Sequence, residues 1–154
     1  MTHTILSFGH GYSAQALSRI LLPQGWQITG TTRSEVKAEA LADQGVAPLI
    51  FPGDGDGDGD GDGDGDGDVA DAIAQASHLL ISAGPDASGD PVLNAVGDMI
   101  SARARQFEWV GYLSTTGVYG DHQGAWVDEN TPLTPSTRRG QWRKDAEEAW
   151  QAVP

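Results

Sequence analysis

The sequence predicts an α/β fold built on a parallel sheet, and three observations support this. Short apolar runs alternate with segments of helical period, which is the pattern of strands and crossover helices. The first apolar run leads into a glycine-rich turn that opens directly into a helix. The chain of 154 residues is long enough to bury one apolar core. We therefore expect a Rossmann-like doubly wound sheet, incomplete after its fifth strand, formed by residues 1–154 as one partial domain.

Five apolar runs are the expected strands. They cover residues 4–8, 26–31, 47–51, 78–82 and 109–114. Each run is short and is followed by glycine, proline or polar residues, as in the buried strands of a parallel sheet. The chain order then requires a helical crossover between consecutive strands.

The intervening segments carry signals for helices. Residues 13–22 place Ala14, Leu17 and Leu21 on one face, and the helix ends before Gly25. Ser34 is expected to cap a second helix that ends near residue 45, and a short third helix covers 69–76. A fourth starts at the Asp-Pro pair at 90–91 and runs to 105, and the last begins near residue 136 or 138.

Residues 53–68 are eight consecutive Gly-Asp pairs between the third strand and the third helix. The tract has no apolar face and low helical propensity, so we expect a solvated insertion. Its aspartates also fit the spacing of a calcium-binding EF-hand loop. A repeat of this kind satisfies any such spacing automatically, and the loop's bidentate glutamate and preceding helix are both missing, so we expect no specific metal site there.

The composition limits the classes of function. The formal net charge is −13, and eight of the 22 acidic residues belong to the Gly-Asp tract. An acidic chain is not expected to bind nucleic acid. The start lacks the pattern of a secretion signal, no apolar run approaches the ~20 residues of a membrane span, and cysteine is absent. We therefore expect a cytoplasmic protein without membrane association, acting on a small molecule that the sequence does not specify.

The glycine-rich turn has the form Gly-x-Gly-x-x-Ala over residues 9–14. Gly9 permits a tight turn, Gly11 lets a pyrophosphate approach the backbone, and the small Ala14 lets helix and strand pack closely. Amides at the start of the helix, from Tyr12 and Ser13, face the phosphates. The alternative is an ordinary strand-to-helix turn. Because strand, turn, helix and second strand occur in this order, the motif favours dinucleotide binding.

The end of the second strand indicates which dinucleotide is bound. NAD sites place an acid there against the ribose hydroxyls, whereas this chain has Thr32, Arg33 and Ser34. Arg33 can pair with a 2′-phosphate, and the two hydroxyl groups can donate hydrogen bonds to it. The alternative is that Arg33 is an exposed residue before a helix. The pattern favours NADP, with NAD possible.

Residues 113–121, Leu-Ser-Thr-Thr-Gly-Val-Tyr-Gly-Asp, followed by Val-Asp-Glu at 127–129 and Thr-Pro at 131–132, resemble the extended short-chain dehydrogenases, the NAD(P)-dependent epimerase/dehydratase group. The resemblance implies a doubly wound fold and an oxidoreductase or epimerase. It implies that Thr115 hydrogen-bonds a substrate oxygen, with Ser114 and Thr116 as neighbouring candidates. It also implies that Asp54 touches the adenine and that Ala83 lies behind the ribose.

Two departures from the family pattern bear on activity. The Tyr-x-x-x-Lys motif expected upstream of Ala146-Glu147 is replaced by Arg139 and Arg143. Arginine stays charged and is not a proton donor, so standard hydride chemistry is in doubt. The chain also ends at Pro154, before the strands and the substrate lobe that the family would supply, so the resemblance implies a truncated member.

Three functional hypotheses follow: an NADP-dependent oxidoreductase or epimerase, a cofactor-binding protein without chemistry, and an inactive truncated fragment. The four histidines show no ligand spacing, so no metal is expected. Core packing is expected to account for four of the five tryptophans (Trp26, Trp109, Trp142 and Trp150), which leaves Trp126 in a loop.

Overall fold

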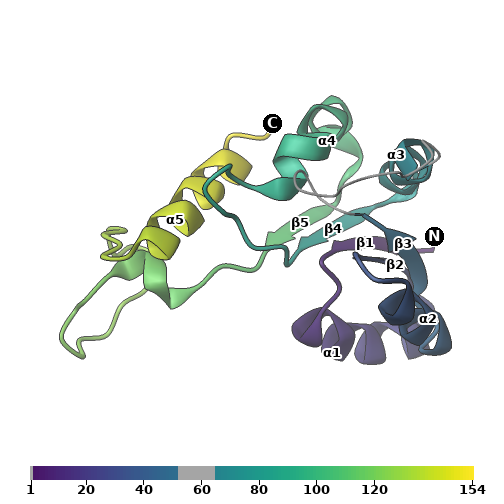
Figure 1. Cartoon of the computed structure of the whole chain (residues 1–154), viewed down its shortest axis with the longest axis horizontal. Helices are drawn as coiled ribbons and strands as arrows, with labels where there is room; N and C mark the ends of the chain where they lie inside the picture. Colours follow the sequence, from purple (N-terminus) through teal and green to yellow (C-terminus); the bar gives the residue numbers. More distant parts are fainter. Residues whose placement is uncertain (1, 52–64) are drawn as a thin grey trace.

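The computed structural model describes residues 2–51 and 65–154, and its core is one parallel sheet (Figure 1). The strands are β1 (Thr4–Phe8), β2 (Gln27–Thr32), β3 (Ala47–Ile50), β4 (His78–Ile81) and β5 (Trp109–Tyr112). Their order is β3-β2-β1-β4-β5. The order reverses between β1 and β4, which confirms the predicted doubly wound topology.

Helices cover both faces of the sheet. They are α1 (Tyr12–Leu21), α2 (Glu35–Asp43), α3 (Gly65–Gln75), α4 (Pro91–Ala102) and α5 (Arg138–Gln151), with short 3-10 turns at Leu22–Gln24, Ala104–Gln106 and Thr116–Tyr119. Figure 1 shows α1 and α2 below the sheet, α3 and α4 above it, and α5 beyond β5. Within the described residues, every helix is too short or too polar to cross a membrane.

Two apolar clusters, one on each face, hold these layers together. Leu6 and Phe8 of β1 point into the cluster under α3 and α4, whereas Ile5 points into the cluster under α1 and α2. In β4, Leu79 and Ile81 face the first cluster and Leu80 faces the second. Both central strands are therefore buried on two sides, which is why their sequences are nearly continuous apolar runs.

The third helix starts earlier than expected. It was predicted over residues 69–76, but α3 covers Gly65–Gln75, so the predicted start was wrong and the last four residues of the Gly-Asp tract are helical. Val69, Ile73 and Ala76 are buried one turn apart on a single face. Burial of this face stabilises the helix, and packing of this kind outweighs the low propensity of glycine and aspartate in the first turn.

Trp109 also differs from the expectation. It was expected in the core, but 47% of its surface is exposed because β5 is the edge strand of the sheet in the described part of the chain. Trp150 on α5 is buried as expected. A side chain in a strand is therefore buried or exposed according to where that strand lies in the sheet, at its centre or at its edge.

Asp90 joins α4 to α5. Its Oδ1 accepts hydrogen bonds from the amides of Val92 and Leu93 at 3.0 and 2.9 Å, which caps α4 as the Asp-Pro pair predicted. Its Oδ2 accepts a bond from the indole Nε1 of Trp150 at 3.1 Å. One buried carboxylate therefore accepts hydrogen bonds from the first-turn amides of α4 and from a tryptophan of α5, which holds the two helices together.

We predict that Asp90→Ala lowers the free energy of unfolding by about 2–4 kcal/mol, because it removes a helix cap and leaves the Trp150 indole without its acceptor. Urea unfolding followed by tryptophan fluorescence measures the change. Asp98→Ala, on the exposed side of the same helix, is the control and should change stability by less than about 0.5 kcal/mol. Equal losses in the two variants would contradict the anchoring role of Asp90.

Candidate functional site

The turn between β1 and α1 is fastened to the end of β2. Gly9 has a left-handed φ of 72°, and the amide of Gly11 donates to the Gly9 carbonyl at 2.7 Å. The amide of Gly9 donates to the Thr31 hydroxyl at 2.8 Å, and the amide of His10 donates to the Thr31 carbonyl at 3.0 Å. The tight turn expected at Gly9 is therefore present and has a fixed position over the sheet edge.

The two glycines of the turn meet different surroundings. A Cβ added at Gly9 would lie 2.9 Å from the backbone nitrogen of Ala83, which follows β4. A Cβ added at Gly11 would meet nothing closer than the Gly9 carbonyl, at 3.7 Å. The fold therefore requires glycine at position 9. At position 11 the space that glycine leaves is open to solvent.

The start of α1 presents unpaired backbone amides to the same space. Gly11 is the N-cap and offers no side-chain acceptor, so the first-turn amides from Tyr12 onward have no capping partner. Ala14 is 2% exposed and packs in the cluster beneath α1, as its small size predicted. The positive end of the helix dipole thus points to the carboxyl edge of the sheet, where anions are favoured.

His10 supports the turn from below. Its side chain is 6% exposed, and its Nε2 lies 3.4 Å from the Ser18 hydroxyl. Burial lowers the pKa of the His10 imidazole below its usual value, so the ring is neutral at neutral pH. A Cβ on Gly30 of β2 would come within 2.7 Å of the ring, so that strand glycine makes room for the histidine.

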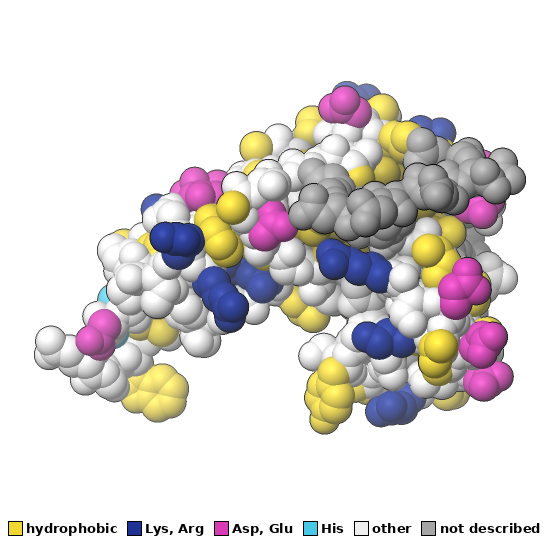
Figure 2. Space-filling model, viewed as in Figure 1, with side chains coloured by type: hydrophobic (Ala, Val, Ile, Leu, Met, Phe, Trp, Pro, Cys, Tyr) yellow, Lys and Arg dark blue, Asp and Glu magenta, His cyan; other side chains and the backbone are white. Residues whose placement is uncertain are grey.

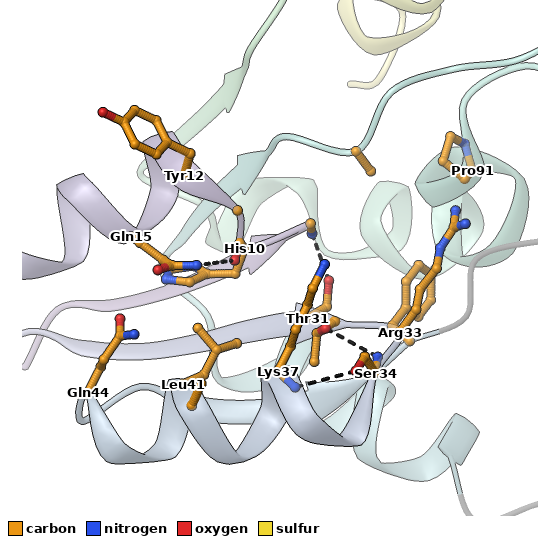
Figure 3. Close-up of a pocket in the computed structure, with 16 residues that line it drawn as sticks. His10, Tyr12, Gln15, Thr31, Arg33, Ser34, Lys37, Leu41, Gln44 and Pro91 are labelled. Carbon is orange, nitrogen blue, oxygen red and sulfur yellow. Dashed lines mark hydrogen bonds between the residues drawn. The ribbon is translucent and has the colours of Figure 1, made fainter.

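Two cations lie where β2 joins α2, Arg33 in the connection and Lys37 in the first turn of the helix. Thr32 Oγ1 accepts the amide of Ser34 at 3.3 Å, and Ser34 Oγ caps α2 by accepting the amide of Lys37 at 3.4 Å. Because both hydroxyl oxygens accept here, their protons remain available to a ligand. Arg33 and Lys37 are exposed, and Figure 3 shows both side chains rising from this connection. Lys37 was not among the residues predicted from the sequence, although its place three residues after the expected cap Ser34 was a usable signal.

These elements enclose a pocket of about 560 Å³ (Figure 3). Seven of the predicted cofactor residues line it, namely Gly9, Gly11, Tyr12, Thr32, Arg33, Ser34 and Ala83. Within the described part of the chain, its wall contains no aspartate or glutamate. Ser13 and Ala14 are not part of the wall, and Asp54 lies outside the described residues.

Figure 2 shows the molecule hollowed between the half with α1 and the half with α5, with Lys and Arg side chains bordering the hollow.

The other end of the carboxyl edge holds the predicted catalytic position. Thr115 is exposed, outside the pocket wall, and its hydroxyl oxygen accepts the amide of Gly117 at 3.4 Å. The neighbouring Ser114 hydroxyl donates to the Glu147 carboxylate on α5. The alternative role for Thr115 is that of a strand-end residue whose hydroxyl bonds its own backbone. Its oxygen does cap the short turn that follows, while its proton stays available for a substrate oxygen, so both roles remain compatible with the structure.

Arg143, which the sequence comparison placed at the lysine of the Tyr-x-x-x-Lys motif, contacts the end of the sheet. Its Nη1 donates to the Leu113 carbonyl at 2.8 Å, and its guanidinium lies 5.8 Å from the centre of the Tyr112 ring. A Cβ on Gly84, after β4, would come within 3.2 Å of its Nη2. Burial raises the pKa of the Tyr112 phenol, and the Arg143 charge partly offsets this rise. Arg139, at the tyrosine position, is exposed.

The topology, the glycine-rich turn and the pocket at the switch point define a Rossmann-type doubly wound fold. The first half of the chain supplies the turn and the basic connection, and the second half supplies the Thr115 and Arg143 region.

Known proteins are similar to this chain in sequence or in structure. Protein YeeZ of Escherichia coli (strain K12) is 29% identical over 148 residues, which are 95% of this chain and 52% of YeeZ. A conserved protein of unknown function from Silicibacter pomeroyi is 57% identical, with a TM-score of 0.82 over 99% of this chain and 49% of that one. UDP-glucuronic acid 4-epimerase from Bacillus cereus is 16% identical, with a TM-score of 0.66 over 97% of this chain and 52% of that one.

The expected fold resemblance is therefore confirmed, since solved structures with this fold include NAD-dependent epimerase/dehydratase and short-chain dehydrogenase/reductase proteins. The chain spans about half the length of the curated relatives it matches. A comparison with models of protein families finds no match.

We predict that Gly9→Ala and Gly11→Ala separate the structural from the ligand-facing glycine. Gly9→Ala should lower the free energy of unfolding by more than about 1–2 kcal/mol, because an L-residue is strained at that φ and its Cβ meets the backbone of Ala83. Gly11→Ala should change it by less than about 0.5 kcal/mol. Thermal and urea unfolding of both variants measure this, and similar losses in the two would show that both glycines serve the fold.

Proposed function

We propose that this chain binds NADP in the pocket at the carboxyl edge and forms the cofactor-binding part of an oxidoreductase of the epimerase/dehydratase type. The observation that carries the proposal is the pair of cations at the β2–α2 connection. Arg33 and Lys37 line a pocket whose described wall contains no carboxylate. A 2′-phosphate is favoured by such a wall, whereas the ribose hydroxyls of NAD are usually held by an acid.

Each part of the pocket has a defined role in the proposal. The unpaired amides at the start of α1 bind the pyrophosphate, and Gly11 keeps that approach free. Arg33 forms the bidentate contact to the 2′-phosphate, Lys37 adds a point charge, and the Thr32 and Ser34 hydroxyls donate hydrogen bonds. Ala83, which contacts the Gly9 turn, lies behind the ribose. Asp54 remains a candidate for the adenine.

The comparisons support binding of a nicotinamide dinucleotide by this fold. The Bacillus cereus epimerase was solved in a complex with UDP-glucuronic acid and NAD, and the Bordetella bronchiseptica enzyme WbmG in a complex with NAD and UDP. The preference for NADP over NAD rests on Arg33 and Lys37 of this chain. A substrate, and the location of the protein in the cytoplasm, stay predictions from the sequence.

A second candidate is a cofactor-binding protein without chemistry, which the arginines on α5 favour. Arg143 is hydrogen-bonded to the Leu113 carbonyl, and Arg139 carries a charge where the family has its proton donor. The two arginines can hold an anion or stabilise a developing alkoxide, but neither supplies a proton.

We predict that the protein binds NADPH roughly ten- to a hundredfold more tightly than NADH, which is the range for charge-assisted bonds worth ~1.5–3 kcal/mol. Arg33→Ala should abolish most of this ratio, and Lys37→Ala should reduce it by less, because lysine makes no bidentate contact. Fluorescence or calorimetric titration with both cofactors measures the ratio.

Arg19→Ala is the matched control for these titrations. Arg19 is exposed on α1, outside the pocket, so its loss changes the net charge equally without removing a contact. The NADP preference is refuted by equal affinities for the two cofactors in the unmodified chain. Binding of neither cofactor to the folded chain would refute the proposal as a whole.

We also predict that the chain, supplied with NADPH and nucleotide sugars or simple carbonyls, shows no steady turnover, because a proton donor is missing at position 139. Absorbance at the NADPH band measures oxidation. The double variant Arg139→Tyr/Arg143→Lys tests the cause, since it restores the family pair. Turnover by the unmodified chain that is lost in Thr115→Ala would contradict the prediction and establish Thr115 as a catalytic residue.

A further inference from the structure

Three potential metal ligands meet at the opposite, amino edge of the sheet. His3 precedes β1, His78 is the first residue of β4, and Glu108 precedes β5. One ligand atom from each side chain, two imidazole nitrogens and one carboxylate oxygen, lies within 4.8 Å of the others. The residues are far apart in sequence, so ligand spacing along the chain did not reveal them.

The sheet itself brings the three residues together. β1, β4 and β5 are adjacent, and the register pairs Ile5 with His78 and His78 with Trp109. The amide of Glu108 donates to the Ser77 carbonyl at 2.8 Å. The three backbones are thus held by the ladder, and in Figure 1 this edge lies toward the marked N-terminus. The arrangement does not depend on the dinucleotide pocket at the other edge.

Neighbouring side chains orient both imidazoles. The His3 ring stacks on Trp26 with centroids 4.8 Å apart, and Trp26 meets the His78 ring edge-on at the same separation. The His78 Nδ1 lies 2.8 Å from the Ser77 hydroxyl. That hydroxyl also bonds the amide and carbonyl of Thr4 at 3.0 Å. A hydrogen bond from one ring nitrogen to a backbone-anchored group is the usual way in which a metal-binding histidine is oriented, and it leaves the other nitrogen as the ligand atom.

The donor set suits zinc. Zn²⁺ takes imidazole nitrogen and carboxylate oxygen at about 2.0–2.2 Å, which puts tetrahedral neighbours about 3.4 Å apart. The three atoms lie within 4.8 Å of one another, so they need to approach by at most about 1.4 Å. His3 and Glu108 are exposed and His78 is half-buried, so small rotations of the two exposed side chains can close the site.

We propose that His3, His78 and Glu108 form a zinc-binding site at the amino edge of the sheet, with a fourth position open to water. Three protein ligands with one open position is the arrangement of an accessible, exchangeable site, whereas structural zinc sites use four protein ligands. Because the ligands lie at the starts of three adjacent strands, bound zinc connects the amino ends of β1, β4 and β5 and stabilises the folded chain over the unfolded one.

Titration of the full chain with Zn²⁺, followed by the imidazole NMR signals and by thermal unfolding, tests the proposal. The signals of His3 and His78 should shift at equimolar metal, while those of His10 and His122 should not. Excess zinc should raise the melting temperature by roughly a few degrees. Calcium, which prefers oxygen ligands, should not reproduce the histidine shifts and serves as a control for the acidic tract.

Variants separate this site from other zinc ligands in the chain. His78→Ala and, with less risk to the fold, Glu108→Gln should weaken zinc binding roughly tenfold or more. His122→Ala is the matched control, since His122 bonds the Tyr119 carbonyl away from the cluster. Unchanged zinc affinity in both ligand variants, or equimolar zinc that leaves the His3 and His78 signals in place, would overturn the proposal.

Discussion

The sharp turn at Gly9 is the constraint on which the rest of the site depends. The chain leaves β1, the strand buried on both faces, and must cross the end of β4 before it enters α1. Only a residue without Cβ passes the Ala83 backbone at that distance and adopts that φ. Thr31 then fixes the turn with its hydroxyl and carbonyl. The α1 amides and the end of β2 are thereby set side by side, with the pocket between them.

Among the described residues, the wall of the pocket carries charge of the opposite sign to the chain as a whole. The net charge is −13, yet Arg33 and Lys37 line the pocket and Arg143 lies beside the residues that follow β4. Local placement of cations decides which ligand is attracted at close range, because more distant exposed charges are screened at physiological ionic strength. An acidic protein can therefore present an anion site at this edge.

Two side-chain hydrogen bonds hold α5 in place. The buried Asp90 carboxylate accepts one from Trp150 near the end of the helix, and the Glu147 carboxylate accepts the other from Ser114. Arg143 lies on this helix and bonds the Leu113 carbonyl. Two contacts therefore hold α5 against the sheet, and Arg143 has a fixed place beside the residues that follow β5.

The sequence by itself determined the strands, the order of helices, the Gly9 turn and the cap at Asp90, because each depends on residues adjacent in the chain. The tertiary structure decided the exposure of Trp109, the helical state of Gly65, the approach of Arg143 to Gly84 and the meeting of His3, His78 and Glu108. These features depend on strand order and register. Strand order and register arise from packing between distant segments, which local propensity and spacing do not specify.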